Sequence, residues 1–205
     1  MLLLDPTTLE AAKEQRVTLY GVTWEQYLEI SAIFVDRFPR LTYLAGILEI
    51  TMTTSVEHES LKKIITRLLE TYAEESNIDL NGYGNATFRN QDGQRGVEPD
   101  ECYCLGALKE VPDIALEIVL TSGGVDKLAV YWGLGVPEVW FWQQQKLTFY
   151  HLASNGQEYL QSDRSLLLPD LDPSLLMGFI QIDQQTQAVR NYRQSLKESR
   201  RASLQ

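Results

Sequence analysis

Two acids and one lysine of this sequence have the types and the order that metal-assisted hydrolysis requires. Asp100 precedes a β-prone run, Glu117 interrupts the apolar run 114–120, and Lys127 follows it. An ionised carboxylate among apolar neighbours needs a partner or a metal, or its pKa rises until it is neutral. If the strands carrying Asp100 and Glu117 are neighbours, their carboxylates form an oxygen site that suits Mg²⁺ or Mn²⁺. Such an ion can generate a hydroxide and offset charge on a phosphate.

Each of these residues also has a purely structural interpretation. Glu117 can lie on an exposed face or edge and pair with a lysine, and Lys127 can be a solvated helix lysine paired with Glu138 or Asp126. Asp113 competes with Asp100 as the first acid. It stands four residues before Glu117, so on one strand the two are about 13 Å apart, too far to share one ion.

The hydrophobic periodicity predicts the elements that position these residues. Leu61, Ile64, Ile65, Leu68 and Leu69 recur at helical spacing, so a helix is expected over 55–75, capped by Thr54 or Ser55. Glu57, His58 and Glu59 then lie in its first turn. Further helices are expected at 7–15, 23–34, 125–135 and 172–180, and strands at 40–52 (a hairpin around Ala45-Gly46), 100–105, 113–120, 137–142, 146–152 and 158–162. A central sheet with helices packed on it is the simplest architecture.

Composition limits the possible functions. The chain has 205 residues, 44% hydrophobic and 22% charged, as in one globular domain, and a net charge of −10 that argues against nucleic acid. Basic residues gather near the end, at Arg190, Arg193, Lys197, Arg200 and Arg201. They fit either a solvated terminal helix or an arm that contacts DNA.

The location and the state of the thiols also follow from the sequence. No signal peptide and no membrane-spanning run is recognised, so a cytoplasmic protein without membrane contact is expected. Cys102 and Cys104 point to one face of a strand, which disfavours a mutual disulfide and predicts reduced core thiols. Trp140 and Trp142 share one strand face, with Phe141 on the other, which favours core packing over base stacking.

The order of these motifs resembles a known family. "EPD", followed by "PDIALEIVLTSGGVDKLAVYWGLGVPEVWFW", resembles the Uma2 family of restriction endonucleases, within the PD-(D/E)XK nuclease superfamily, over about residues 24–152. The resemblance implies an α/β fold of α+β type, restriction-endonuclease-like, with a central mixed sheet flanked by helices. Two features depart from the family: "TSGG" replaces its "S-P-S" loop, and the chain is strongly acidic. Val119 occupies the usual (D/E)XK lysine position, so the resemblance passes the lysine role to Lys127.

The resemblance assigns roles to particular residues. Asp100 and Glu117 match the metal-binding acids, and Lys127 matches the lysine on the following helix. A helix acid, Glu59 or Glu57, would complete the metal environment. His58 aligns with a histidine often found there, and Glu98 is a further acid near the metal.

These assignments lead to one main hypothesis and two alternatives. The main hypothesis is a homodimeric, Mg²⁺- or Mn²⁺-dependent endonuclease that hydrolyses phosphodiester bonds in DNA. The alternatives are an inactive binding or regulatory protein on the same fold and a small-phosphoester hydrolase. The expected organisation is an N-terminal extension (1–22), a nuclease-like domain (23–182) and a basic C-terminal tail or helix (183–205).

Overall fold

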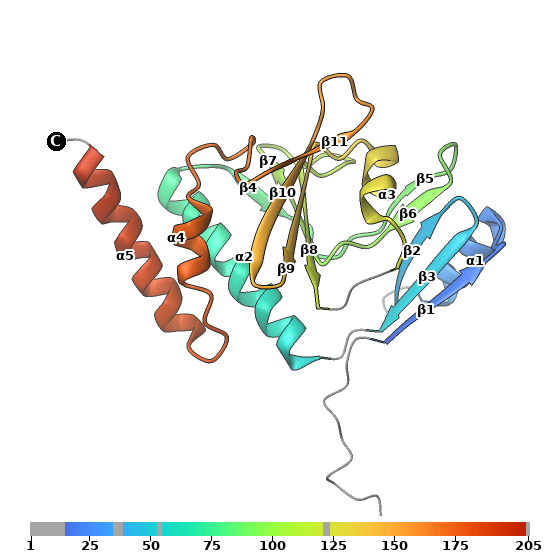
Figure 1. Cartoon of the computed structure of the whole chain (residues 1–205), viewed down its shortest axis with the longest axis horizontal. Coiled ribbons are helices and arrows are strands. Elements are labelled where there is room, and N and C mark those ends of the chain that lie inside the picture. The colour runs from blue at the N-terminus through green and yellow to red at the C-terminus, as the bar shows by residue number, and fades with distance from the viewer. Residues whose placement is uncertain (1–14, 35–38, 53–54, 121–123, 204–205) are drawn as a thin grey trace, which may run out of the picture.

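The computed structural model describes residues 15–34, 39–52, 55–120 and 124–203 (Figure 1). Of the helix expected at 7–15, only Gln15 lies within these residues, and it begins a strand instead. The helices and strands of the described part, in chain order, are β1 (Gln15–Tyr20), α1 (Trp24–Ile33), β2 (Arg40–Leu44), β3 (Ile47–Met52), α2 (Val56–Ser76), β4 (Leu80–Gly82), β5 (Phe88–Asn90), β6 (Arg95–Val97), β7 (Glu101–Leu105), β8 (Ile114–Val119), α3 (Lys127–Leu134), β9 (Glu138–Gln143), β10 (Lys146–Leu152), β11 (Tyr159–Ser162), α4 (Pro173–Gly178) and α5 (Gln185–Ser203).

The larger of two sheets has the strand order β11-β10-β9-β8-β7-β4. Only β8 and β9 in it run parallel, and α3 makes the crossover that a parallel pair requires. One face of β8 carries Ile114, Leu116 and Ile118 into a core with α2. Trp140 and Trp142 are buried in the same core, which confirms the prediction that they pack internally. This is the mixed sheet flanked by helices that was predicted.

A second sheet was not predicted. Its order is β1-β3-β2-β6-β5, and all of its neighbouring strands are antiparallel. The small sheet is additional to the predicted central sheet, which is present. The chain leaves the small sheet at Val97 and enters the large sheet at Glu101. Pro99 lies between them, and a proline has no N–H for a strand ladder, so pairing is interrupted there.

Helix α3 lies between the two sheets (Figure 1). Its residues Val130 and Tyr131 are buried in one cluster with Val97 of the small sheet and with Ala115 and Val139 of the large sheet. The helix begins where the Asp126 side chain accepts a hydrogen bond from a backbone N–H of its first turn. It ends at Gly135, whose φ of 74° is the left-handed conformation that glycine adopts without strain. The side chains of α3 are thereby fixed relative to both sheets.

The start of α2 is fixed in a similar way. The Ser55 hydroxyl accepts a hydrogen bond from the backbone N–H of His58, so α2 begins one residue after the predicted cap. The helix ends at Asn77, which is left-handed with φ 52°. The cap places His58 and Glu59 in the first turn, at the end of α2 that lies nearest the small sheet (Figure 1).

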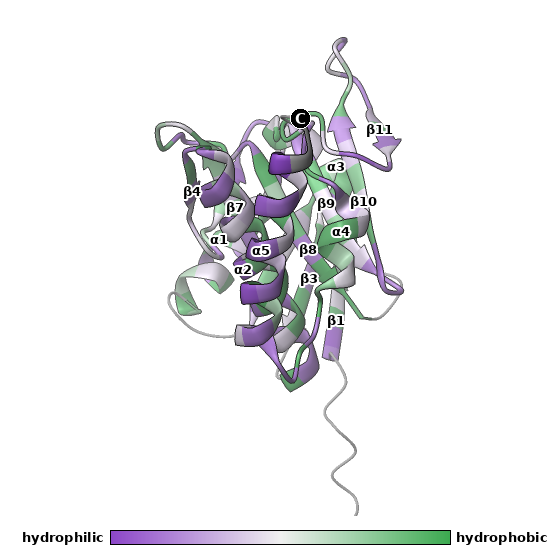
Figure 2. Cartoon of the chain, turned by 90° about the vertical axis from the view of Figure 1, so that its left-hand side faces the viewer, coloured by the Kyte–Doolittle hydropathy of each residue, from purple (hydrophilic) through white to green (hydrophobic). Residues whose placement is uncertain are grey.

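Both ends of the described chain pack on the body of the protein. Strand β1, which lies inside the expected extension 1–22, pairs with β3 along its whole length. Helix α5 buries Tyr192 and Leu196 against the α2 core and turns a hydrophilic face outward (Figure 2). Arg193 pairs with Glu74 and Glu75 of α2, so part of the basic charge there is neutralised within the chain. Within the described ranges, no helix is both long and apolar enough to span a membrane.

Candidate active site

Asp100 and Glu117 lie side by side in the gap between the two sheets. In the antiparallel register of β7 and β8, Glu101 faces Leu116, so Asp100 faces Glu117 one position further on. Their exposed fractions are only 3% and 0%. The backbone N–H of Ile118 donates to Oδ2 of Asp100 at 2.7 Å and holds this carboxylate against β8. The two acids therefore have the juxtaposition that the sequence led us to expect.

Helix α3 supplies a donor to each oxygen of Glu117. Lys127 Nζ lies 2.6 Å from Oε2, and the Tyr131 hydroxyl donates to Oε1 at 2.5 Å. The two donors are one helical turn apart and therefore share one face of α3. The alternative partners proposed for Lys127 are engaged elsewhere: Asp126 caps α3, and Glu138 binds the segment around residues 165–167. The structural interpretation of a solvated Lys127 is therefore wrong.

Asp100 is held by two cationic side chains from other elements. Oδ1 accepts from Arg40 of β2 and lies 3.2 Å from Nε2 of His58. The other ring nitrogen of His58 lies 3.0 Å from Oε1 of Glu59, which also pairs with Lys62 at 2.6 Å. Because a carboxylate faces each ring nitrogen of His58, both nitrogens act as donors only in the charged imidazolium.

The burial of these groups shifts their pKa values in different directions. Burial raises the pKa of Glu117, and the charge of Asp100 adds to the increase against the opposing effect of Lys127. Burial would also raise the pKa of Asp100, but the hydrogen bond from His58 and the charge of Arg40 outweigh it and hold that pKa far below its ordinary value. Burial would lower the pKa of His58, yet the hydrogen bond to Asp100 raises it overall. The pKa of Lys127 is raised because Glu117 and Asp100 outweigh its loss of hydration.

The family of the chain follows from a comparison with known families. A family model described as "Putative restriction endonuclease" matches residues 24–185, from the first residue of α1 to the first residue of α5. The chain belongs to the Uma2 family. The match confirms the resemblance and the fold class, and it contains both acids, Lys127 and the cations around them. No curated protein matches the chain.

Three other acids considered from the sequence stand apart from the pair formed by Asp100 and Glu117. Glu57 is exposed and lines a separate pocket. Glu98 accepts from the Thr87 hydroxyl and from a backbone N–H of β2, and burial raises its pKa. Asp113 pairs with Lys109 and accepts from the backbone at the end of β7. Glu59 is closer, because His58 connects it to Asp100.

Three residues near the candidate site were missed by the sequence reasoning. Tyr131 follows Lys127 by four residues on a predicted helix, and this spacing could have identified it as a second partner of Glu117. Arg40 has no such local signal, because it reaches Asp100 from a strand in the other sheet. Glu49 of β3 is 1% exposed, and its Oε2 accepts from the backbone N–H of Val125 at 2.9 Å, just before α3.

The chemistry of the donor set fits a hard divalent cation. Mg²⁺ typically binds through one or two carboxylates and keeps several waters, and Mn²⁺ prefers the same oxygen ligands. Asp100 and Glu117 supply two carboxylates that face each other. Among the residues that the structure describes, no group of three or more His, Cys, Asp or Glu side chains is placed to hold a metal. Water and substrate oxygens would therefore complete such a site.

Proposed function

We propose that this Uma2 protein is a metal-dependent endonuclease that hydrolyses phosphodiester bonds in DNA, with Mg²⁺ or Mn²⁺ bound by Asp100 and Glu117. Membership of the Uma2 family supports a nuclease. The observation that carries the proposal is the buried carboxylate pair, which two strands and one proline place at the junction of the sheets. Burying two carboxylates costs free energy even when each has a cationic partner, and ionisable groups with perturbed pKa values cluster at functional sites.

The protein's own side chains divide the work at this site. A bound divalent ion would supply a hydroxide nucleophile at neutral pH and offset the charge of the phosphate. Lys127 keeps its ammonium charged beside Glu117, and its side chain is 23% exposed, so it can also reach a substrate phosphate. Tyr131 holds Glu117 in position from the buried side. His58 and Arg40 orient Asp100, and Glu59 holds His58.

One observation favours a second candidate, a non-catalytic binding protein on the same fold. Every oxygen of Asp100 and Glu117 already accepts a hydrogen bond from the protein. A site of this kind can be retained as a structural charge network. The two candidates differ in whether a divalent cation can displace Arg40 and Lys127. Each carboxylate oxygen has a second lone pair that could bind the cation. The charges of Arg40 and Lys127, however, already balance those of Asp100 and Glu117.

The experiment that tests the proposal is a plasmid-nicking assay with Mg²⁺ or Mn²⁺ and with EDTA. Wild type should nick or cut the plasmid only with the metal, and Glu117→Gln should abolish cleavage. Asp113→Asn is the matched control, because Asp113 belongs to the other "PD" pair and binds only Lys109 and the backbone. Equal cleavage by wild type and Glu117→Gln contradicts the assignment, and no cleavage by either favours the non-catalytic candidate.

We also propose a cytoplasmic homodimer. Cutting two DNA strands needs two active sites, which a two-fold partner provides. Cys102 and Cys104 are free and buried, as expected in a reducing compartment. For the organisation of the chain, we propose the nuclease-like domain as the catalytic unit, with β1 and α5 packed on it. Light scattering of the purified protein tests the dimer.

A further inference from the structure

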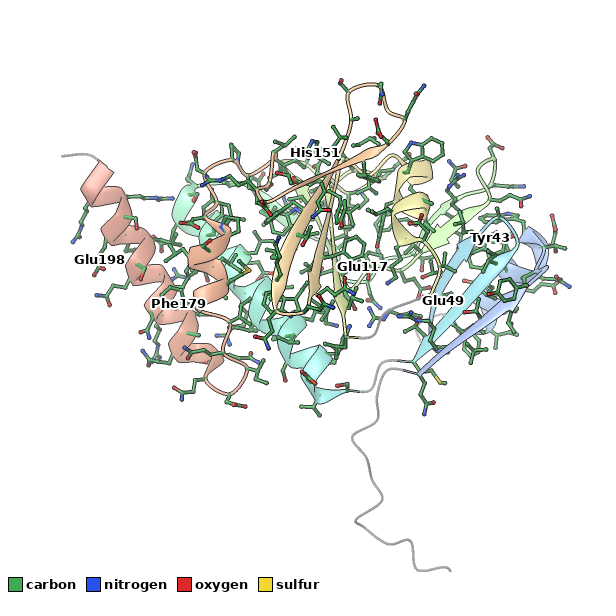
Figure 3. All side chains as sticks on the ribbon, viewed as in Figure 1. Tyr43, Glu49, Glu117, His151, Phe179 and Glu198 are labelled. Carbon is green, nitrogen blue, oxygen red and sulfur yellow. The ribbon has the colours of Figure 1, made fainter. Side chains whose placement is uncertain are left out.

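A pocket of about 490 Å³ opens beside Lys127, between the large sheet and the start of α3. Its residues Phe141 and Thr148 occupy the cross-strand positions next to Glu117. In the strand register Glu117 lies beside Phe141, and Phe141 lies beside Thr148, so all three point to the same face of the sheet. Phe141 and Thr148 line the pocket, and Lys127 links it to Glu117. Figure 3 shows Glu117 and Glu49 toward this side of the large sheet and Phe179 on the opposite side.

The floor of the pocket is aromatic. Phe141 and Tyr150 come from the adjacent strands β9 and β10, and both are partly buried. Their rings meet edge to face, with centroids 5.6 Å apart and an interplanar angle of 88°. Val119 and Leu128 add apolar surface. An aromatic floor with partly exposed rings suits a planar base, since every nucleobase can stack on a ring.

The walls of the pocket offer positive charge. Lys127, Arg16 and Lys146 line it together with two acids, Glu49 and Asp126. The acids are engaged by the protein: Glu49 accepts from a backbone N–H and lies 3.4 Å from Arg16, and Asp126 caps α3. Lys146 pairs with Asp163 at the surface, where both side chains are largely exposed, and such a pair is readily exchanged for another anion. The lining thus has three basic groups and two acids on a chain that is acidic overall, and Lys127 also pairs with Glu117 beside the pocket.

We infer that this pocket binds one unpaired nucleotide of the substrate strand, next to the bond that is cut. Because the two rings are perpendicular, the base stacks on one of them, Phe141, with Tyr150 at its edge, and the backbone phosphate lies toward Lys146 and Arg16. The volume lies in the range of pockets for single small ligands and is too small for a duplex. The position relative to the scissile bond rests on the proposed function. Binding itself does not, because no pocket group named here requires a metal.

The base contact is tested by fluorescence anisotropy with a labelled single-stranded oligothymidylate in EDTA. Phe141→Leu keeps an apolar side chain but removes the ring, and it should weaken binding by about 5- to 100-fold, the effect of losing one base–aromatic stack. Phe179→Leu is the matched control, because Phe179 packs in the core on the other face of the large sheet. The Phe179→Leu variant should bind the strand like wild type. Circular dichroism and thermal melts establish that both variants fold. Unchanged affinity of folded Phe141→Leu overturns the assignment.

The phosphate contact is tested by the salt dependence of the same binding. Removing one phosphate contact should lower the slope of log K against log salt by about 0.7 for a single strand. Lys146→Gln should show this decrease, whereas Lys109→Gln, which removes a lysine from another surface ion pair, should not. Equal slopes for the two variants overturn the proposed phosphate contact.

Two further results separate this inference from its alternatives. Free thymidine monophosphate should compete much more weakly than the strand, because it lacks neighbouring phosphates, and equal competition overturns the assignment to a strand. If the strand binds as described but plasmid is never cut, the proposed function fails and the pocket assignment stands. If plasmid is cut and Phe141→Leu binds normally, the pocket assignment fails alone.

Discussion

Replacing Lys127 with methionine would leave the Glu117 carboxylate buried without its cation. Glu117 has no exposed surface, and its Oε2 lies 2.6 Å from Lys127 Nζ. Removing one partner of a buried ion pair costs about 3–5 kcal/mol. Tyr131 still donates to the other oxygen, and Lys127 is itself 23% exposed, so the lower end, about 3 kcal/mol, is expected. For a domain of this size that corresponds to a fall in Tm of roughly 6–12 °C.

The loss in Lys127→Met should depend on pH in a defined direction. The pKa of Glu117 in the folded protein is already raised above its ordinary 4.5, and removing Lys127 raises it further. Between pH 4.5 and the folded pKa, Glu117 is protonated in the folded state and ionised in the unfolded state. The free energy of unfolding therefore falls as the pH rises through this range. The loss of stability in Lys127→Met should therefore be smallest below about pH 4.5, where the Glu117 carboxyl is neutral in the folded and the unfolded state. It should grow as the pH rises through the folded pKa.

Urea denaturation at several pH values measures both effects. The double variant Glu117→Gln with Lys127→Met removes both charges of this pair and should recover much of the lost stability, since it leaves no unpaired charge at position 117. Lys109→Met breaks an ion pair whose lysine is 46% exposed, and it should cost no more than about 1 kcal/mol. A loss in Lys127→Met no larger than that of Lys109→Met, or one independent of pH, would refute the account of a buried, charged pair.

Three further outcomes are expected. In an NMR titration, the imidazole of His58 should titrate above its ordinary value of 6.5, and Asp100→Asn should lower that pKa. Because the folded pKa is raised, the stability gained from this contact is present below pH 6.5 and lost as the pH rises through the folded pKa; a pKa unchanged by Asp100→Asn would contradict it. Tyr131→Phe loses a hydrogen bond to a buried carboxylate and should cost about 1.5–3 kcal/mol in urea denaturation; a neutral effect would contradict the contact. Cys102, whose pKa burial raises to about 12, and Cys104 should react with a thiol reagent only after unfolding; rapid labelling of the native protein would show that they are accessible.

Local signals were enough to predict the elements that hold the acids. The apolar stripe of α2, a cap at Thr54 or Ser55 and a stop at Gly133 or Gly135 are recognisable from residue type and spacing alone, and the structure has Ser55 and Gly135 in these roles. The alternation along β8 likewise predicted that Glu117 lies on the opposite face from Leu116 and its neighbours. These features depend on neighbours a few residues apart, where backbone geometry fixes which side chains meet.

Partners chosen by tertiary topology could not be predicted in this way. Arg40 pairs with Asp100 only because the small sheet packs beside the large one, and nothing in the sequence around Arg40 indicates this. The pairing of β1 with β3 was also missed, because the hydrophobic periodicity of a short edge strand is weak. Glu49 was also missed, because nothing in the sequence of its hairpin indicates that this side chain is buried.

The central claim is that Asp100 and Glu117 together hold a divalent cation. Crystals of the protein grown or soaked with Mn²⁺ test it most directly through the anomalous scattering of the metal. We expect a peak between the two side chains, with an oxygen of each at bonding distance and with Lys127 displaced from Glu117. A structure at saturating Mn²⁺ in which Arg40 and Lys127 keep their present contacts, with no peak between the acids, would contradict the account.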